Sequence, residues 1–62
     1  MDEFKEHQLV SLTKSFPDLP KGTVGTIVYM YEYDYACEVE FVTDMGSETV
    51  TLLLTEIEPY KG

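Results

Sequence analysis

The sequence predicts an all-β protein, a small barrel built from short and strongly curved strands. Gly22 and Gly25 open a run of β-branched residues that ends at Val28. Glycine allows backbone angles and close approaches that a Cβ forbids, so this spacing indicates a tight bend into a curved strand. Residues 36–42 alternate apolar and acidic side chains, which is typical of a strand with one buried face. Four tyrosines lie between these segments at two-residue spacing: Tyr29, Tyr31, Tyr33 and Tyr35.

Length and charge limit what such a barrel can do. The 62 residues allow one domain, residues 1–62, and a chain of this size buries only about 60% of the surface that it exposes when unfolded. Twelve Asp or Glu stand against four Lys, there is no Arg, and the formal net charge is -8. Nucleic-acid affinity comes largely from Lys and Arg, so we expect no nucleic-acid partner and instead a basic protein partner.

Cysteine content and the first residues indicate the compartment. Cys37 is the only cysteine, whereas small secreted scaffolds usually carry several disulfides. Residues 1–6 are charged where a secretory signal needs an apolar core, and the longest apolar stretch, residues 50–54, is too short to span a bilayer. We therefore expect a cytoplasmic protein with no membrane partner.

The first strand is expected at residues 8–12, with Val10 and Leu12 on its buried face and Leu9 on the opposite face or at a rim. Residues 13–21 contain two prolines among polar residues, which disfavours ladder pairing, so a long surface loop should follow. We expect Leu19 to hold this loop against one end of the barrel.

The second strand is expected at residues 23–31, which are rich in Thr, Val, Ile and Tyr. Apolar residues occur on both faces of this strand. One face would carry Val24, Val28 and Met30, and the other Ile27, Tyr29 and Tyr31. A sharply bent strand that serves two packed sheets would explain the pattern.

A hairpin is expected next, from residues 36–42 to residues 50–54. Its inward side chains would be Cys37, Val39, Phe41, Val50, Leu52 and Leu54, and its outward ones Glu38, Glu40, Thr49, Thr51 and Leu53. A turn at residues 43–46, with Gly46 in the left-handed position, would join the strands. The resulting pairs would be Val42 with Ser47, Val39 with Val50 and Cys37 with Leu52. A register slip of one residue would bury glutamates, which fixes this choice.

A single 3-10 turn is expected at residues 55–58, with Thr55 as its N-cap and Ile57 pointing inward. Pro59 and Tyr60 would follow in the last strand. Five short strands, a long first loop and a 3-10 turn before the last strand are the element order of an SH3-like barrel. The expected fold class is therefore all-β, a five-stranded SH3-like barrel.

The sequence also resembles a known family. The shared pattern comprises Val10, Leu12, Gly22, Gly25-Thr26-Ile27-Val28, Glu38-Val39-Glu40-Phe41-Val42, Gly46 and the leucine run 52–54. Over nearly the whole chain it is similar to short, mostly bacterial proteins grouped as a domain of unknown function, number four-nine-two-six. The Gly-Thr-Ile-Val and Val-Glu-Phe-Val strands are the most specific part, because the glycine spacing alone also occurs in KOW-type barrels. The resemblance implies the small-barrel fold, and it supplies no established activity and no catalytic residues.

The candidate binding surface is an acidic face that displays tyrosines. Tyrosine offers a broad amphipathic contact with few rotatable bonds, and carboxylates attract basic partners. The residues assigned to this protein-binding surface are Tyr31, Tyr33, Tyr35, Glu32, Asp34, Glu38 and Glu40. A second interpretation is purely structural: the first tyrosines pack at the barrel rim, the later ones lie in a turn, and the glutamates form the solvated side of a hairpin.

No residue pattern indicates catalysis or a bound metal. His7 has no second His and no Cys at ligand spacing, and a calcium loop needs more oxygens than Asp44 and Glu48 supply. Cys37 alternates with apolar residues, which predicts a small buried side chain rather than a reactive thiol. The chain also lacks Trp and the alanine-leucine-tyrosine-aspartate signature of SH3 domains that bind proline-rich peptides. We expect no enzyme activity, no cofactor and no metal.

Three classes of function follow, and the first is favoured. It is a non-enzymatic acidic protein-binding module, for example an immunity or antitoxin protein or a regulatory partner of a basic protein. The second is a structural, homo-oligomeric accessory domain whose strand edges and Leu53 contact other copies. The third is a KOW-type barrel associated with nucleic acid, which the net charge disfavours.

Overall fold

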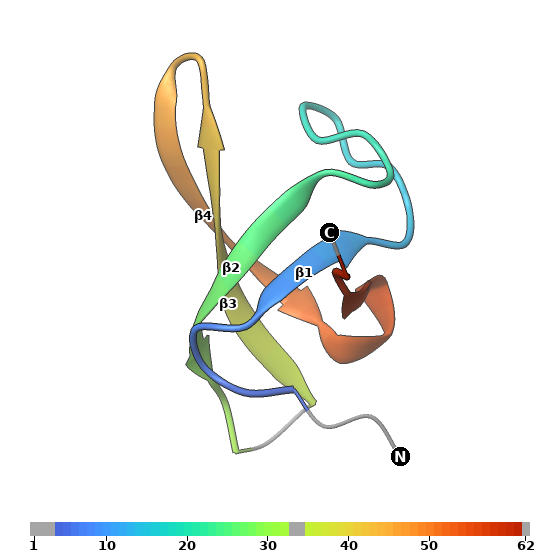
Figure 1. The fold of residues 1–62 in the computed structure, drawn as a ribbon, viewed down its shortest axis with the longest axis vertical. Helices are drawn as coiled ribbons and strands as arrows, with labels where there is room; N and C mark the ends of the chain where they lie inside the picture. Colours follow the sequence, from blue (N-terminus) through green and yellow to red (C-terminus); the bar gives the residue numbers. More distant parts are fainter. Residues whose placement is uncertain (1–3, 33–34, 62) are drawn as a thin grey trace.

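The computed structural model describes residues 4–32 and 35–61, which form a single antiparallel sheet with one short 3-10 helix (Figure 1). The elements are β1 (Leu9–Leu12), β2 (Val24–Met30), β3 (Ala36–Thr43), β4 (Gly46–Leu53), η1 (Leu54–Glu56) and β5 (Ile57–Pro59). The all-β class, the five strands and the 3-10 turn before the last strand are confirmed. No helix in the described ranges is long and apolar enough to cross a membrane.

The strands pair in the order β4-β3-β2-β1-β5. Strands β4 and β5 stand at the two ends of this order and do not pair with each other in the described part of the chain. The hydrogen-bonded sheet is therefore open between β4 and β5, and the predicted closure into a barrel stays a prediction. Figure 1 shows the β3–β4 hairpin extending past β1 and β2, and the long loop after β1 lying at the same end of the molecule.

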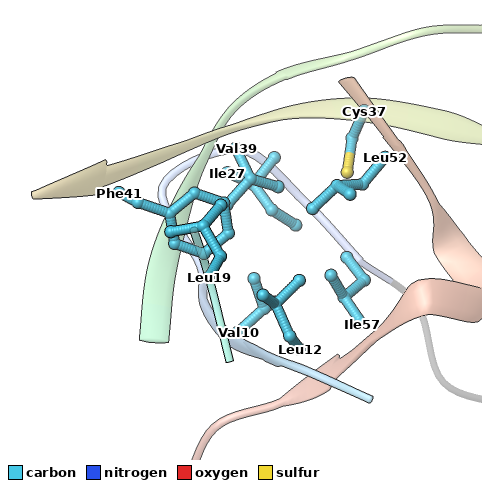
Figure 2. Close-up of a cluster of buried hydrophobic side chains, with 9 residues drawn as sticks. All are labelled: Val10, Leu12, Leu19, Ile27, Cys37, Val39, Phe41, Leu52 and Ile57. Carbon is cyan, nitrogen blue, oxygen red and sulfur yellow. The ribbon is translucent and has the colours of Figure 1, made fainter. Parts of the chain in front are cut away.

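One hydrophobic core receives side chains from every strand (Figure 2). Its members are Val10, Leu12, Leu19, Ile27, Cys37, Val39, Phe41, Leu52 and Ile57, none more than 5% exposed. Each large apolar side chain buried in this way stabilises the fold by about 1.5–3 kcal/mol. Leu19 comes from the long loop and lies beside Phe41, which confirms the predicted attachment of that loop to the core.

The β3–β4 hairpin has the predicted register. Val39 pairs with Val50, Val42 with Ser47 and Cys37 with Leu52. Gly46 has a φ of +114°, so it takes the backbone region that the predicted turn reserves for glycine. The inward side of β3 is buried and the outward side of β4 is exposed, as the alternation of apolar and polar residues requires.

The two glycines before and inside β2 have different functions. Gly22 has a φ of +92° in the turn before the strand. Gly25 is buried, and a Cβ at this position would lie 2.7 Å from both the Phe41 ring and a Val39 methyl group. Gly22 thus provides the backbone angle and Gly25 provides the close approach. These are the two properties of glycine from which the sequence motif predicted a tight bend.

A β-bulge interrupts β2. Ile27 lies opposite Val39 and Tyr29 lies opposite Glu38, so Val28 is the additional residue. Ile27 is buried, Val28 and Tyr29 are exposed, and Met30 packs against the core. The prediction that Val28 shares a face with Met30, and Tyr29 with Ile27, is therefore wrong, because the bulge reverses the alternation between them.

The 3-10 turn begins one residue earlier than predicted, and Thr55 does not cap it. Its N-cap position is Leu53, whose backbone N–H donates a 2.9 Å hydrogen bond to Oε1 of Glu56. The other Glu56 oxygen, Oε2, lies 3.1 Å from Nζ of Lys14. The Leu53 N–H and the Lys14 ammonium together hold the pKa of Glu56 below its usual range. Ile57 points into the core as expected.

Candidate binding surface

On the outer surface of β2, β3 and β4, the two predicted glutamates lie between hydroxyl-bearing residues of the neighbouring strands. One cross-strand row places Glu38 between Tyr29 and Thr51. The next row, toward the hairpin tip, places Glu40 between Thr26 and Thr49. Thr49 and Thr51 are therefore neighbours of the two glutamates, as the sequence predicted. These six residues, together with Tyr31, are called the acidic face below.

Glu38 is the centre of a hydrogen-bonded cluster on the acidic face. The Tyr31 hydroxyl donates to Oε2 of Glu38, and Thr51 Oγ1 donates to the same oxygen at 2.6 Å. Tyr29 meets Tyr31 edge to face, with ring centroids 5.0 Å apart and planes at 75°. Oε1 of Glu38 receives no hydrogen bond from the described residues. The cluster thus fixes the carboxylate in place and leaves one oxygen for an outside donor.

The cluster moves two pKa values away from neutrality. Hydrogen bonds from Thr51 and, next, from Tyr31 lower the pKa of Glu38 from its usual 4.5. The hydrogen bond that the Tyr31 hydroxyl donates to Glu38 raises the pKa of this hydroxyl from its usual 10.0. At neutral pH, Glu38 is therefore an anion and Tyr31 a neutral donor.

An open hollow of about 600 Å³ lies beside this cluster. Its lining, among the described residues, consists of Glu6, Tyr29, Met30, Tyr31, Glu32, Ala36 and Thr51. The two tyrosine rings and the Met30 side chain give it apolar surface, and two carboxylates stand around it. Such a combination suits a long side chain with an apolar stem and a positive end.

Glu6 reaches the hollow because the segment before β1 continues along β2. The His7 N–H donates a 2.7 Å hydrogen bond to the carbonyl of Ile27. His7 itself has a φ of +73°, an uncommon conformation for a residue other than glycine. No sequence motif in this segment predicted that Glu6 would approach the tyrosines.

Charge is distributed unevenly along the chain. Lysines occur only at positions 5, 14, 21 and 61, so residues 22–60 contain none. The same range holds eight acidic residues: Glu32, Asp34, Glu38, Glu40, Asp44, Glu48, Glu56 and Glu58. The one ion pair within residues 4–32 and 35–61 joins Lys14 to Glu56, at the 3-10 turn. The Glu38 carboxylate, in contrast, is held by neutral groups and keeps its charge.

The structure brings some of the predicted site residues together and separates others. Tyr31 and Glu38 form the cluster, Glu32 lines the hollow, and Glu40 lies one row away on the same face. Tyr35 lies in the turn before β3, is 81% exposed and does not line the hollow. Tyr33 and Asp34 fall outside the described residues.

The tyrosines at two-residue spacing do not form one continuous strand. Strand β2 ends at Met30 and β3 begins at Ala36. Tyr29, which the prediction left out of the binding set, belongs to the cluster, whereas Tyr35 adopts a φ of +49° and uses its carbonyl to accept a hydrogen bond from the Leu54 N–H. Two-residue spacing signals a shared face only while the strand continues without a bulge or a turn.

The remaining candidate groups do not form a second chemical site. Cys37 is fully buried, and burial raises the pKa of its thiol, which agrees with the predicted small buried side chain. A hollow at the hairpin tip is lined by Asp18, Thr43, Asp44, Met45 and Glu48. Within the ranges that the structure describes, no group of three His, Cys, Asp or Glu is placed to hold a metal ion.

The chain matches the profile of a protein family. The profile described as "Domain of unknown function (DUF4926)" matches residues 6–58. Comparisons with curated proteins and with solved structures found no match. The matched range begins at Glu6 and ends inside β5, so it includes the acidic face and the residues that line the hollow.

Proposed function

This chain belongs to the DUF4926 family, a domain of unknown function, as its resemblance predicted. From that premise we propose that it is a non-enzymatic module that binds a basic protein through the acidic face. The observation that carries the proposal is the Glu38 carboxylate, which two neutral hydroxyls hold in place beside the hollow.

The hollow supports recognition of a Lys or Arg side chain. The stem of such a side chain would lie against the rings of Tyr29 and Tyr31, where a cation is attracted to the aromatic faces. Its charged end would then meet the Oε1 atom of Glu38, which the cluster leaves open. Glu6 and Glu32 would add negative potential at the rim of the hollow.

The shifted pKa values support binding rather than acid–base catalysis. A general acid or base works best when its pKa lies near the working pH. Here the pKa of Glu38 is lowered and that of Tyr31 is raised, so at neutral pH Glu38 stays deprotonated and Tyr31 stays protonated. A fixed anion attracts a cation at all physiological pH values, which suits a binding module.

The charge distribution supports a basic protein over a nucleic acid. Phosphate binding needs Lys or Arg on the contacting surface, and residues 22–60 supply neither. A net charge of -8 would also speed the approach of a basic partner, as in immunity or antitoxin proteins that mask one. A cytoplasmic location is part of this proposal.

The test compares two charge changes of equal size. We would identify the partner by affinity capture and then measure its association rate with the wild type and with the Glu38→Gln/Glu40→Gln double variant. We expect the double variant to bind more slowly and more weakly, and to lose part of the salt dependence of the rate. Glu58→Gln, combined with Asp18→Asn, removes the same charge away from the cluster and from β4, and serves as the control.

Two results would contradict the proposal. One is an equal loss of binding in the control pair, which would assign the effect to net charge alone. The other is an association rate that does not change with salt or with the substitutions on the acidic face.

A further inference from the structure

Strand β4 is an open edge of the sheet next to the acidic face. It is eight residues long, and in the described chain it pairs only with β3. Natural edge strands are commonly protected from pairing by proline, lysine, a bulge or short length. Strand β4 contains neither Pro nor Lys, its single charged residue is the acidic Glu48, and its pairing with β3 runs through all eight positions without a bulge. It therefore presents a regular row of backbone groups.

The alternation of an antiparallel ladder shows which residues present that row. Within β4, every second residue directs its N–H and C=O toward β3, and the others direct them away. Leu53 belongs to the second set, because its N–H bonds to the Glu56 carboxylate at 2.9 Å and not to β3. Ser47, Thr49 and Thr51 have the same parity as Leu53, so their backbone groups point to the open edge.

The side chains of these residues suit a neighbour with basic groups. Ser47, Thr49 and Thr51 are small, and the last two lie opposite Glu40 and Glu38 on β3. A strand added to β4 would lie about 4.8 Å from it and about twice that distance from β3. Lys or Arg side chains at alternate positions of the added strand would extend over the small hydroxyl groups toward the two carboxylates.

We propose that β4 pairs with an extended segment of the partner that carries Lys or Arg at alternate positions. The inference rests on the proposed function, and it adds the conformation of the partner and the edge that it occupies. Main-chain hydrogen bonds would supply affinity, and the alternate basic side chains would supply specificity. A second copy of this chain suits the edge less well, because each copy carries a net charge of -8.

The experiment uses a synthetic peptide as the probe. The peptide has capped ends, eight residues to match β4, and Lys alternating with Thr. The control peptide has the same composition with all of its Lys in one half. We expect the alternating peptide to bind more tightly and to slow hydrogen exchange at the backbone amides of Ser47, Thr49 and Thr51.

Two changes test the backbone contact itself. Thr49→Pro removes an N–H from the open edge without removing a bond to β3, whereas Thr49→Val keeps the N–H. We expect about tenfold weaker peptide binding for Thr49→Pro and a small change for Thr49→Val. Methylating alternate backbone nitrogens of the peptide should weaken binding to the wild type in the same way, so the test does not depend on how well Thr49→Pro folds.

The outcomes separate this inference from the proposed function. If Glu38→Gln/Glu40→Gln abolishes peptide binding but Thr49→Pro and the methylated peptide bind normally, strand pairing is wrong and the proposed function stands. If the backbone changes weaken binding and the charge changes do not, the edge pairs with strands but the basic partner is wrong. Sedimentation that shows a dimer, lost in Thr49→Pro, would assign the edge to a second copy and overturn the inference.

Discussion

Strand β3 presents Cys37, Val39 and Phe41 to the core and Glu38 and Glu40 to the outer surface, and different interactions hold the two sides. The three inward side chains are at most 1% exposed and belong to the core to which every other strand contributes. The two outward carboxylates are partly exposed and lie between hydroxyl-bearing neighbours on β2 and β4. Packing density fixes the inner side, and on the outer side directed hydrogen bonds fix Glu38.

A short chain can thus give the two faces of one strand different chemistry. On the inner side even a methyl group matters, since Gly25 leaves no space between Val39 and Phe41. On the outer side a carboxylate keeps its charge, because its bonding partners Tyr31 and Thr51 are neutral. Glu56, in contrast, shares its charge with Lys14 inside the same molecule.

The largest expected effect is on the inner side. Phe41→Ala should cost about 3–5 kcal/mol of unfolding free energy, because Phe41 is a large, fully buried side chain of the core. Urea denaturation followed by circular dichroism measures this change. Val42→Ala, at the adjacent residue that is 82% exposed, is the control and should change the free energy by less than about 0.5 kcal/mol. Similar losses in both variants would remove the distinction between the two sides.

The next effect tests the close approach of Gly25. Gly25→Ala should destabilise the protein by about 1–3 kcal/mol, because the new Cβ would overlap the Phe41 ring and the Val39 methyl group. Combining it with Phe41→Leu provides space for the Cβ, so the double variant should lose less than the two single losses added together. Strictly additive losses in thermal or urea unfolding would show that the overlap does not determine the cost.

A smaller effect is expected at Glu56, the carboxylate that serves folding. Glu56→Ala should cost about 0.5–2 kcal/mol through the lost hydrogen bond to the Leu53 N–H. Lys14→Ala should cost less, about 0–1 kcal/mol, because the Lys14 side chain is 60% exposed. The pKa of Glu56 is lowered in the folded protein, so its contribution is present above the unfolded pKa and is lost as pH falls through the folded one. Urea unfolding should therefore show a difference in unfolding free energy between the wild type and Glu56→Ala at neutral pH that shrinks at acidic pH.

The smallest effect on stability is expected at the acidic face, where the measurable change is in the pKa of Glu38. Thr51→Val and Tyr31→Phe should each raise the pKa of Glu38 toward its usual value, because each removes a donor to the carboxylate. Carboxyl NMR titration measures this shift. Thr49→Val, opposite Glu40, is the matched control and should leave the Glu38 titration unchanged.

The same cluster predicts that Glu38 and Tyr31 lose their contributions to folding stability at opposite ends of the pH range. The contribution of Glu38 is present above its unfolded pKa and is lost as pH falls through its lowered folded pKa. The contribution of Tyr31 is present below its unfolded pKa and is lost as pH rises through its raised folded pKa. A Glu38 pKa that does not respond to Tyr31→Phe or Thr51→Val would contradict the hydrogen-bonded cluster.

Sequence patterns predicted the hairpin because its two sides differ chemically. Val39 alternates with Glu38 and Glu40, and a shifted register would have buried carboxylates. Strand β2 has no such contrast, since Ile27, Val28 and Tyr29 are all apolar strand formers. The position of the extra residue in β2 was therefore not visible in the sequence, and the face of Tyr29 was predicted wrongly.

The candidate site divides in the same way. The neighbours of Glu38 and Glu40 on β4 followed from the register, so Thr49 and Thr51 could be predicted. The approach of Glu6 depends on backbone contacts between the segment before β1 and Ile27, which leave no pattern in the side chains. The capping of the 3-10 turn from its third residue, Glu56, also escaped prediction, because Thr55 offered the more familiar signal.

Because Cys37 is buried, its reaction with a thiol reagent reports how often the native core opens. Alkylating reagents react with thiolate that solvent can reach, whereas the single thiol of this chain is enclosed and burial raises its pKa. Iodoacetamide should therefore label the protein only as often as β3 separates from its neighbours. A ligand that binds β4 and holds it against β3 would slow the labelling of Cys37. Mass spectrometry could measure the labelling rate without any engineered tag.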